Sequence, residues 1–380
     1  MTAPAKGPAA GGTAGPAGTV LVARVDNAGD VLLAGPAIRA VAAGAREVVL
    51  LAGPHGRAAG ELLPGVSRVI EWRTPWIDPE PQPVTGPHTA RLIRTVRRAA
   101  PEHALILTSF HQSPLPLALL LRLAGVPRIS AISTDYPGSL LDLRRVVDED
   151  ADVPEAERML GLARAAGFEL PPGDDGGLAV RRPLPEVRHL AGPPGYVAVH
   201  PGVSAPARAW PAESWSGLVR RLSAAGWRVV VTGSPGESGL TARIAGSART
   251  GPPAGGPRIQ AGAAGGEPGT VVDLGGLTTF AELAAVLAGA SVAVAANTGP
   301  AHLAAAVGTP VVSLFAPVVP AARWAPYGVS SAVLGDQDAP CRGTRARTCP
   351  VPGHPCLSSV PEEQVAEAVR RLAVRQEAVV

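Results

Sequence analysis

Residues 290–315 read ASVAVAANTGPAHLAAAVGTPVVSLF, and this stretch is the clearest guide to the fold. An apolar run precedes the polar turn at 297–300, and an alanine-rich run and a second apolar run follow it. Asn297 or Thr298 can cap a helix, and Pro300 fits the first helical turn. A strand, a helix and a strand in succession, without a charged side chain, are typical of a buried parallel sheet with a crossover helix.

The same alternation runs through the rest of the chain. Residues 19–24 form a predicted strand, followed by a polar turn and a helical run at 31–43. A second series begins with a strand at 196–200, after a segment rich in proline and glycine. Strands that alternate with helices indicate parallel sheets covered on both faces, and 380 residues suffice for two such domains. We therefore predict a disordered tail at 1–18, a first domain at 19–185, a second domain at 196–345, and a cysteine-containing loop with a terminal helix at 346–380.

The composition disfavours several classes of protein. The chain has 34 basic and 31 acidic residues, so phosphate-backbone binding is not its main task and no nucleic-acid partner is expected. Its one lysine is Lys6, which excludes a P-loop lysine and a Schiff-base lysine. No G-x-G-x-x-G follows the first strand of either half, which disfavours a nicotinamide dehydrogenase. The tail lacks the apolar region of a signal peptide, so we expect a cytoplasmic protein.

Three loops in the second half follow strands and contain small residues. In open parallel sheets ligands bind beyond the carboxyl ends of the strands, and small residues let backbone amides approach a phosphate. The alternatives are a capped helix that binds nothing, an arginine on the surface, and a glutamate that favours its own helix N-terminus. The candidate nucleotide-sugar-binding residues in and beside these loops are Gly202, Ser204, Arg208, Gly233, Glu237, Asn297, Thr298, Gly299, Pro300 and His302.

The first half contains one candidate catalytic residue. Asp30 lies in the turn between the first strand and its helix, from which a carboxylate can point into an interdomain cleft and act as a general base. The alternative is that Asp30 caps the helix, because aspartate is a preferred N-cap residue. Asn27 and Gly29, in the same turn, are candidates for the acceptor side of the cleft.

Five stretches together resemble a known family. They are RVDNAGDVLLAGPAIRAV at 24–41, HPG at 200–202, RAWPAESW at 208–215, VTGSPGE at 231–237 and NTGPAHLAAAVGTPVVSLF at 297–315. In this order they resemble the lipopolysaccharide heptosyltransferases, glycosyltransferase family 9. The resemblance implies the GT-B fold, an α/β architecture of two Rossmann-like domains facing each other across a cleft. It also implies that the last helix crosses back to the first domain.

The resemblance further implies inverting transfer of heptose from ADP-heptose to a hydroxyl of a glycan or lipopolysaccharide-core-like acceptor. Asp30 is then the base, while the amides of Thr298 and Gly299, together with Arg208, stabilise the leaving diphosphate. No metal and no cofactor besides the donor substrate are expected. We expect a monomer, with peripheral contact to a membrane-bound acceptor at the inner face of the membrane left open. The alternatives are a non-catalytic nucleotide-sugar-binding protein and a sugar-nucleotide epimerase of the GT-B type.

Two positions depart from the family pattern. Asn297 stands where the family usually has aspartate, which leaves the nucleotide preference and the metal dependence open. Arg208 stands where the family usually has lysine, and arginine keeps the charge. Near the C-terminus, a zinc site is the alternative to a loop with idle thiols, and its candidate ligands are Cys341, Cys349, Cys356 and His354.

Two groups of charged residues have simple interpretations. Asp148, Glu149 and Asp150 follow two arginines rather than a strand, so we predict a solvated run of charges there and no metal site. Three arginines fall on one face of a predicted helix, where an exposed face is the expectation and contact with an anionic acceptor or membrane is the alternative. They are Arg91, Arg94 and Arg98.

Overall fold

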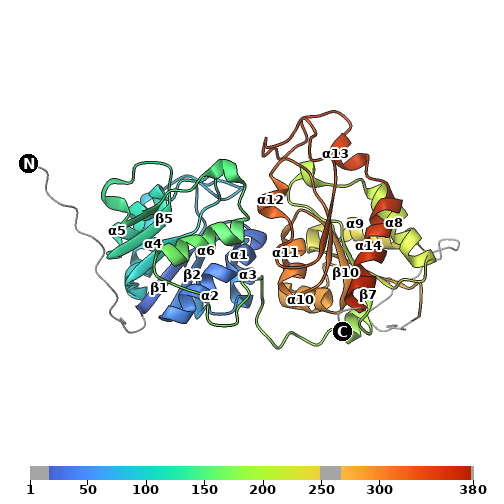
Figure 1. Ribbon diagram of the computed structural model, residues 1–380, viewed down its shortest axis with the longest axis horizontal. Coiled ribbons are helices and arrows are strands. Elements are labelled where there is room, and N and C mark those ends of the chain that lie inside the picture. The colour runs from blue at the N-terminus through green and yellow to red at the C-terminus, as the bar shows by residue number, and fades with distance from the viewer. Residues whose placement is uncertain (1–16, 249–266, 378–380) are drawn as a thin grey trace, which may run out of the picture.

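The computed structural model describes residues 17–248 and 267–377. The tail predicted at 1–18 therefore falls almost wholly outside the described residues, and its last two residues, Ala17 and Gly18, begin the first strand instead. The described chain forms two α/β domains that lie side by side (Figure 1). Among the described helices, none has the combination of length and apolar character that crossing a bilayer requires.

Each domain is built on a parallel sheet of six strands, and every strand pair is parallel. The first sheet has the order β3-β2-β1-β4-β5-β6, with β1 (Ala17–Ala23), β2 (Ala45–Ala52), β3 (Arg68–Glu71), β4 (His103–Ile106), β5 (Arg128–Ile132) and β6 (Leu143–Arg145). The second has the order β12-β11-β10-β7-β8-β9, with β7 (Tyr196–His200), β8 (Val229–Gly233), β9 (Val271–Gly275), β10 (Ala290–Ala296), β11 (Val311–Leu314) and β12 (Ser331–Leu334).

Helices cover both faces of each sheet. Those of the first half and the linker are α1 (Ala28–Leu33), α2 (Gly35–Gly44), α3 (Arg57–Leu62), α4 (Gly86–Ala99), α5 (Leu115–Leu123), η1 (Gly138–Leu140), η2 (Glu149–Ala151), α6 (Glu155–Ala165) and α7 (Arg188–Ala191). Those of the second half are η3 (Pro206–Arg208), α8 (Ala212–Ala224), η4 (Pro235–Glu237), α9 (Ser238–Gly246), α10 (Phe280–Ala288), α11 (Gly299–Ala306), α12 (Ala321–Trp324), α13 (Pro355–Ser358) and α14 (Glu362–Glu377).

The central strand β1 shows why these sequences form buried strands. Val20 and Val22 point to one face of the sheet and pack into one apolar cluster, while Leu21 and Ala23 point to the other face and join a different cluster. All four side chains are at most 1% exposed, because helices cover both faces. A strand buried on two sides needs a continuous apolar run instead of alternation, and β1 has one.

The turns that follow β1 and β10 meet where the two domains face each other. In each sheet the strand order reverses beside one of these strands, and ligands bind beyond the carboxyl ends of strands at such a switch point. β1 leads into α1, β10 leads into α11, and these two helices are in contact across the domains (Figure 1). One apolar cluster contains buried residues of both helices, so the contact is packed and not merely polar.

The terminal helix α14 corrects one expectation. Over its described residues it does not cross back to the first domain, because its main contacts are with α8 and with the strands β10, β11 and β12 of the second domain. Val365, Val369 and Leu372 are buried in the apolar cluster of that domain, as their shared face predicts. The amphipathic pattern of the helix is thus confirmed, but the surface that buries its apolar face belongs to the second domain and not to the first.

Candidate active site

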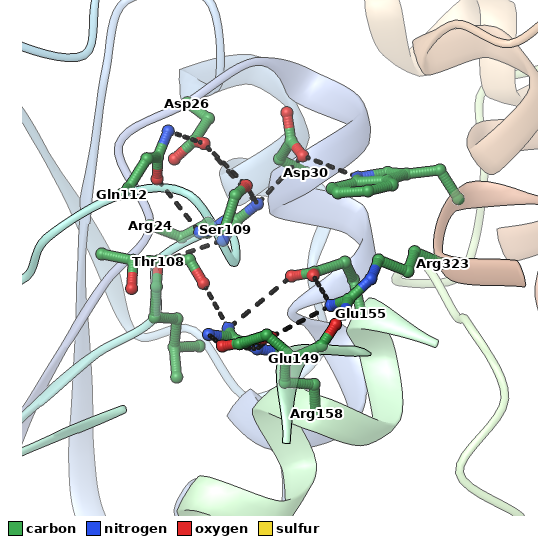
Figure 2. A network of polar contacts seen from close by, with 12 residues as sticks. Arg24, Asp26, Asp30, Thr108, Ser109, Gln112, Glu149, Glu155, Arg158 and Arg323 are labelled. Carbon is green, nitrogen blue, oxygen red and sulfur yellow. Dashed lines mark hydrogen bonds and ion pairs between the residues drawn. The ribbon is translucent and has the colours of Figure 1, made fainter. Parts of the chain in front are cut away.

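The turn after β1 places Asp30 at the domain interface. Asn27 occupies the N-cap position of α1 without a side-chain cap, so Asp30 is the third residue of the helix and not its cap. The Asp30 side chain is 20% exposed. Its Oδ1 accepts hydrogen bonds from Arg24 Nη2 at 2.9 Å and from Trp324 Nε1, in the second domain, at 3.4 Å (Figure 2).

Arg24, at the end of β1, organises the polar groups below this turn. Its guanidinium is fully buried and donates to the carbonyl of Leu107 at 3.2 Å, to Ser109 Oγ at 2.8 Å and to Asp30. Asp26 Oδ2 lies 3.6 Å from the same Nη2. Burial works to lower the pKa of Arg24, but Asp26, Asp30 and other nearby carboxylates raise it above its ordinary value. A buried arginine held between two carboxylates keeps its charge and fixes their positions.

Asp26 is a second carboxylate beside Asp30. It accepts hydrogen bonds from Gln112 Nε2 at 2.9 Å and from Ser109 Oγ at 3.3 Å, and both of these bonds end on Oδ2. Burial raises the pKa of Asp26, and the Asp30 charge adds to this, while Arg24 opposes it. Asp26 is therefore protonated more readily than an ordinary aspartate.

Two adjacent cavities hold every residue that the sequence selected for the site. The first has a volume of about 280 Å³ and is lined by both domains; its predicted site residues are Asn27, Gly29, Asp30, Ser204, Arg208, Asn297, Thr298, Gly299 and His302. The second, of about 330 Å³, adjoins it and includes Asn27, Gly29, Gly202, Ser204, Gly233, Glu237, Thr298, Gly299 and Pro300. Phe280 also lines the second cavity.

Buried polar atoms without a partner gather around the first cavity. Within the described residues, both side-chain polar atoms of Asn297, Nδ1 of His302, Nε of Arg208 and Oδ1 of Asp26 make no hydrogen bond. Each of these four residues lines the first cavity. Buried polar groups are costly unless they are paired, so this concentration indicates a site shaped for a polar ligand.

Arg208 supplies positive charge on the donor side of the first cavity. Its Nη1 donates to the carbonyl of Asn297 at 3.2 Å, which places the guanidinium beside the start of α11. Burial lowers the pKa of His302 to about 4, and that of His200 at the second cavity also to about 4. Both histidines are therefore neutral at pH 7, and Arg208 provides the charge that an anion would need there.

The helix α11 presents its N-terminus to both cavities. Thr298 is the N-cap by position, but its side chain forms no cap, and its hydroxyl lies 3.4 Å from the carbonyl of Ala296. Asn297 does not cap the helix either, because its side-chain atoms are unpaired. The predicted cap is therefore wrong in detail. The Thr298 N–H, which was expected to bind the diphosphate, donates to the carbonyl of Ala296 at 2.8 Å, and the Ala301 N–H donates to that of Thr298 at 3.1 Å. Since Pro300 has no N–H, the amide of Gly299 and the positive end of the helix dipole are what this helix end offers to the site.

Residues 89–354 match the model of the family described as glycosyltransferase family 9 (heptosyltransferase). The chain belongs to glycosyltransferase family 9.

Individual relatives agree with this assignment. Lipopolysaccharide heptosyltransferase 1 of Pseudomonas aeruginosa is 35% identical over 159 residues, which cover 42% of this chain and 38% of that protein. Lipopolysaccharide heptosyltransferase 3 of Escherichia coli is 30% identical over 132 residues, or 34% of each chain. The chain thus aligns with little more than a third of the length of these curated relatives.

A solved structure of similar fold was also found. The structure of E. coli ADP-heptose lps heptosyltransferase II matches with a TM-score of 0.69 at 19% identity, over 94% of this chain and 99% of that chain. The likeness confirms the predicted GT-B fold of two Rossmann-like domains.

Glu237 has the structural role that was the alternative to ligand binding. Its Oε2 accepts from the backbone N–H of Ser234 at 2.7 Å and from the Ser234 hydroxyl at 2.8 Å, which forms a capping box. The carboxylate also lies 3.9 Å from His200 Nε2 and lines the second cavity. Capping therefore holds Glu237 in place beside the cavity, and the two interpretations are compatible.

The cysteine-containing segment near the C-terminus forms no metal site within the described residues. Among them, no group of three histidine, cysteine, aspartate or glutamate side chains is arranged to hold a metal ion. Cys341 and Cys356 are buried free thiols, and burial raises the pKa of Cys356 to about 12. His354 Nε2 lies 3.0 Å from the carbonyl oxygen of Ala207 instead of beside the thiols. The independence of the site from metals stays a prediction.

The structure adds site residues that the sequence did not reveal. Arg24 could have been found, because a charged residue ending an apolar strand is unusual in a buried sheet. Ser109, Gln112 and Trp324 carried no signal, since each comes from a distant segment and meets the Asp30 turn only in the folded chain. Arg91, Arg94 and Arg98 are exposed on α4, as expected.

Gly29 allows the two domains to approach closely. A Cβ atom there would lie 2.8 Å from His302 Cδ2 and 3.2 Å from the Cα of Gly299. We expect Gly29→Ala to displace the Asp30 turn and to lower kcat about 10-fold, which is less than the roughly 10²-fold cost of a 1 Å misplacement. Steady-state kinetics checks this, with Gly239→Ala as the control because a Cβ there meets nothing within 4 Å. Equal kcat in the two variants would contradict it.

The buried histidines predict a loss of stability in acid. His200 and His302 have a pKa of about 4 in the folded protein, mainly through burial, against 6.5 in an unfolded chain. Below pH 6.5 the unfolded chain therefore binds more protons, and we expect the free energy of unfolding to fall as the pH drops toward 4. The slope is about 1.4 kcal/mol per pH unit for each histidine. Denaturant titrations of the parent, of His302→Gln and of the control His189→Gln, an exposed residue, check this; only His302→Gln should flatten the slope.

Proposed function

We propose that this protein is an inverting glycosyltransferase that transfers heptose from ADP-heptose to a hydroxyl of a glycan acceptor. The observation that carries the proposal is the arrangement of one carboxylate, Asp30 of the first domain, and one uncapped helix end, at Gly299 of the second, on a single cavity. The names of the relatives support the choice of donor, since they are lipopolysaccharide heptosyltransferases and an ADP-heptose lps heptosyltransferase.

The proposed reaction is a single displacement. Asp30 takes the proton of the acceptor hydroxyl through Oδ2, because Arg24 and Trp324 both bind Oδ1. The acceptor oxygen attacks the anomeric carbon, and the bond from that carbon to the diphosphate oxygen breaks on the opposite side, which inverts the configuration. The negative charge that develops on ADP is stabilised by the N-terminus of α11 and by Arg208.

The second cavity is the proposed place of the nucleoside. Phe280 offers a ring on which a base can stack, and Glu237 is held by its capping box where a carboxylate can accept hydrogen bonds from ribose hydroxyls. The first cavity then holds the sugar and the acceptor. For the acceptor we propose a lipopolysaccharide core or a similar glycan, reached by a monomer at the inner face of the membrane.

Acceptor-dependent release of ADP tests the proposal. Purified protein is incubated with ADP-heptose, with and without heptose-less lipopolysaccharide, and a panel of nucleotide heptoses and hexoses is screened for thermal stabilisation. We expect ADP-heptose to give the largest increase in melting temperature and ADP release to require the acceptor. Stabilisation without acceptor-dependent release would favour the non-catalytic binding protein, and nucleotide release from donor alone would favour the epimerase.

A further inference from the structure

The short helix α12 of the second domain carries two neighbouring residues, Arg323 and Trp324, whose side chains bind groups of the first domain. Figure 2 shows Arg323 beside Glu149 and Glu155. We propose that these two residues lock the domains in the arrangement seen here and thereby position the carboxylate of Asp30. Trp324 orients the carboxylate and Arg323 anchors the helix that carries Trp324. This inference rests on the proposed function of Asp30 as the base.

Arg323 is held almost entirely by first-domain groups. Its Nε donates to Asp152 Oδ1 at 2.8 Å, and its Nη1 lies 3.2 Å from Glu149 Oε2 and 3.4 Å from Glu155 Oε1. Its Nη2 donates to the carbonyl oxygen of Glu149, and the guanidinium carbon lies 4.6 Å from the ring centroid of Phe110. The Arg323 side chain is 1% exposed, although it belongs to the other domain.

This arrangement corrects the prediction for the acidic segment at 148–150. Glu149 does not belong to a solvated run of charges, because its side chain is only 19% exposed and also pairs with Arg158 Nη2 at 2.6 Å. Glu155 is fully buried, so burial raises its pKa, while Arg24, Arg158 and Arg323 oppose the shift. The acidic socket, formed by Glu149, Asp152 and Glu155, thus sets three carboxylates against Arg158 of the first domain and Arg323 of the second.

A buried ion cluster of this kind selects one geometry. Removing one partner leaves buried charge uncompensated, and a small displacement breaks several directional hydrogen bonds together. A relative movement of the domains that withdraws Arg323 leaves Arg158 Nη1, at 3.9 Å, as the remaining ion-pair partner of Glu155 among the described residues. The cluster consequently favours the domain arrangement in which Arg323 lies among these carboxylates.

Trp324 links the arrangement of the two domains to the orientation of the Asp30 carboxylate. Its Nε1 donates to Asp30 Oδ1 at 3.4 Å, and its ring lies against Phe110 with centroids 5.7 Å apart. Arg24 donates to the same Oδ1 from within the first domain, which leaves Oδ2 for the acceptor hydroxyl. The hydrogen bond from Trp324 forms only when α12 is seated in the acidic socket. The orientation of the base thus depends on domain closure, and Trp324 is a positioning residue.

Trp324→Phe tests the positioning step while retaining an aromatic ring. We expect kcat with ADP-heptose and heptose-less lipopolysaccharide to fall about 10-fold, the size of one hydrogen bond to a charged group, with the KM for ADP-heptose and the Kd for ADP unchanged. A parent-like kcat, or a raised donor KM at unchanged kcat, would overturn the positioning role.

Arg323→Met tests the lock. Small-angle X-ray scattering should show a larger radius of gyration than the parent, and kcat should fall at least as far as in Trp324→Phe. In the double variant the losses should not add, because Arg323 acts through Trp324. The control is Arg39→Met, which removes an ion pair with Asp174 at 2.6 Å inside the first half and should change neither readout. An unchanged scattering profile would overturn the lock.

Failure of this inference and failure of the proposed function give different results. If the parent transfers no sugar, the proposed function fails, the positioning role falls with it, and scattering from Arg323→Met alone decides whether the lock exists. If the parent transfers sugar and both variants match it in kcat and in scattering, the function stands and the inference is wrong.

Discussion

Asp30→Asn is expected to reduce sugar transfer by roughly 10²- to 10⁴-fold in kcat, the contribution of a general base. The amide cannot accept the proton of the acceptor hydroxyl, yet it keeps the shape of the carboxylate and can still accept a hydrogen bond from Arg24. Binding of ADP should be retained, since the donor residues belong to the second domain. The measurement is initial ADP release in the presence of heptose-less lipopolysaccharide, together with calorimetry of ADP binding.

The control for this variant is Asp174→Asn. Asp174 forms a bidentate pair with Arg39 and is 13% exposed, so the change removes a comparable ion pair away from the two cavities. We expect Asp174→Asn to cost stability without a loss of kcat. If Asp30→Asn transfers sugar at the parent rate, Asp30 is not the general base of the reaction.

Arg208→Met is expected to lower kcat by about 10²- to 10³-fold, as expected for loss of one group that stabilises developing charge. The partly buried guanidinium donates to the backbone carbonyl of Asn297 beside the N-terminus of α11, where the proposal places the diphosphate. His200 and His302 are neutral at pH 7 and cannot take over this charge, and the other arginines that line the first cavity, Arg345 and Arg347, are exposed. The affinity for ADP should fall as well, which calorimetry measures.

Two further variants sharpen this prediction. Arg208→Lys keeps the charge but loses the planar fork, so we expect a partial recovery of kcat relative to Arg208→Met. The control is Arg243→Met, because Arg243 pairs with Glu213 on the exposed surface of the same domain. If Arg208→Met binds ADP and turns over like Arg243→Met, the leaving group is stabilised elsewhere.

Much of this site could be predicted because short segments carry their own signals. The turn at 297–300 combines a strand end, two small polar residues and a proline, and it indeed starts a helix at the cleft. Asp30 was selected from its place in a strand-to-helix turn, and the structure puts its carboxylate on the first cavity. Both inferences depend on neighbours within a few residues, which the sequence displays directly.

The errors concern choices between distant partners. The apolar stripe of α14 must pack against another surface, but the sequence pattern is the same whichever domain supplies that surface. In the structure the helix packs against the second domain. Glu149 was predicted to be solvated because its neighbours in sequence are charged. Glu149 instead binds Arg323, which lies 174 residues further along the sequence.

By itself, the sequence determined that two parallel α/β sheets form and that small, polar turns end their central strands. It could do so because hydrophobic period, capping and turn residues act over distances of a few residues. Only the tertiary structure decided that Arg323 enters the acidic socket, that Trp324 reaches Asp30 and that unpaired polar atoms surround one cavity. Those contacts depend on how two domains are oriented, and orientation is set by the packing of surfaces that are remote from one another along the chain.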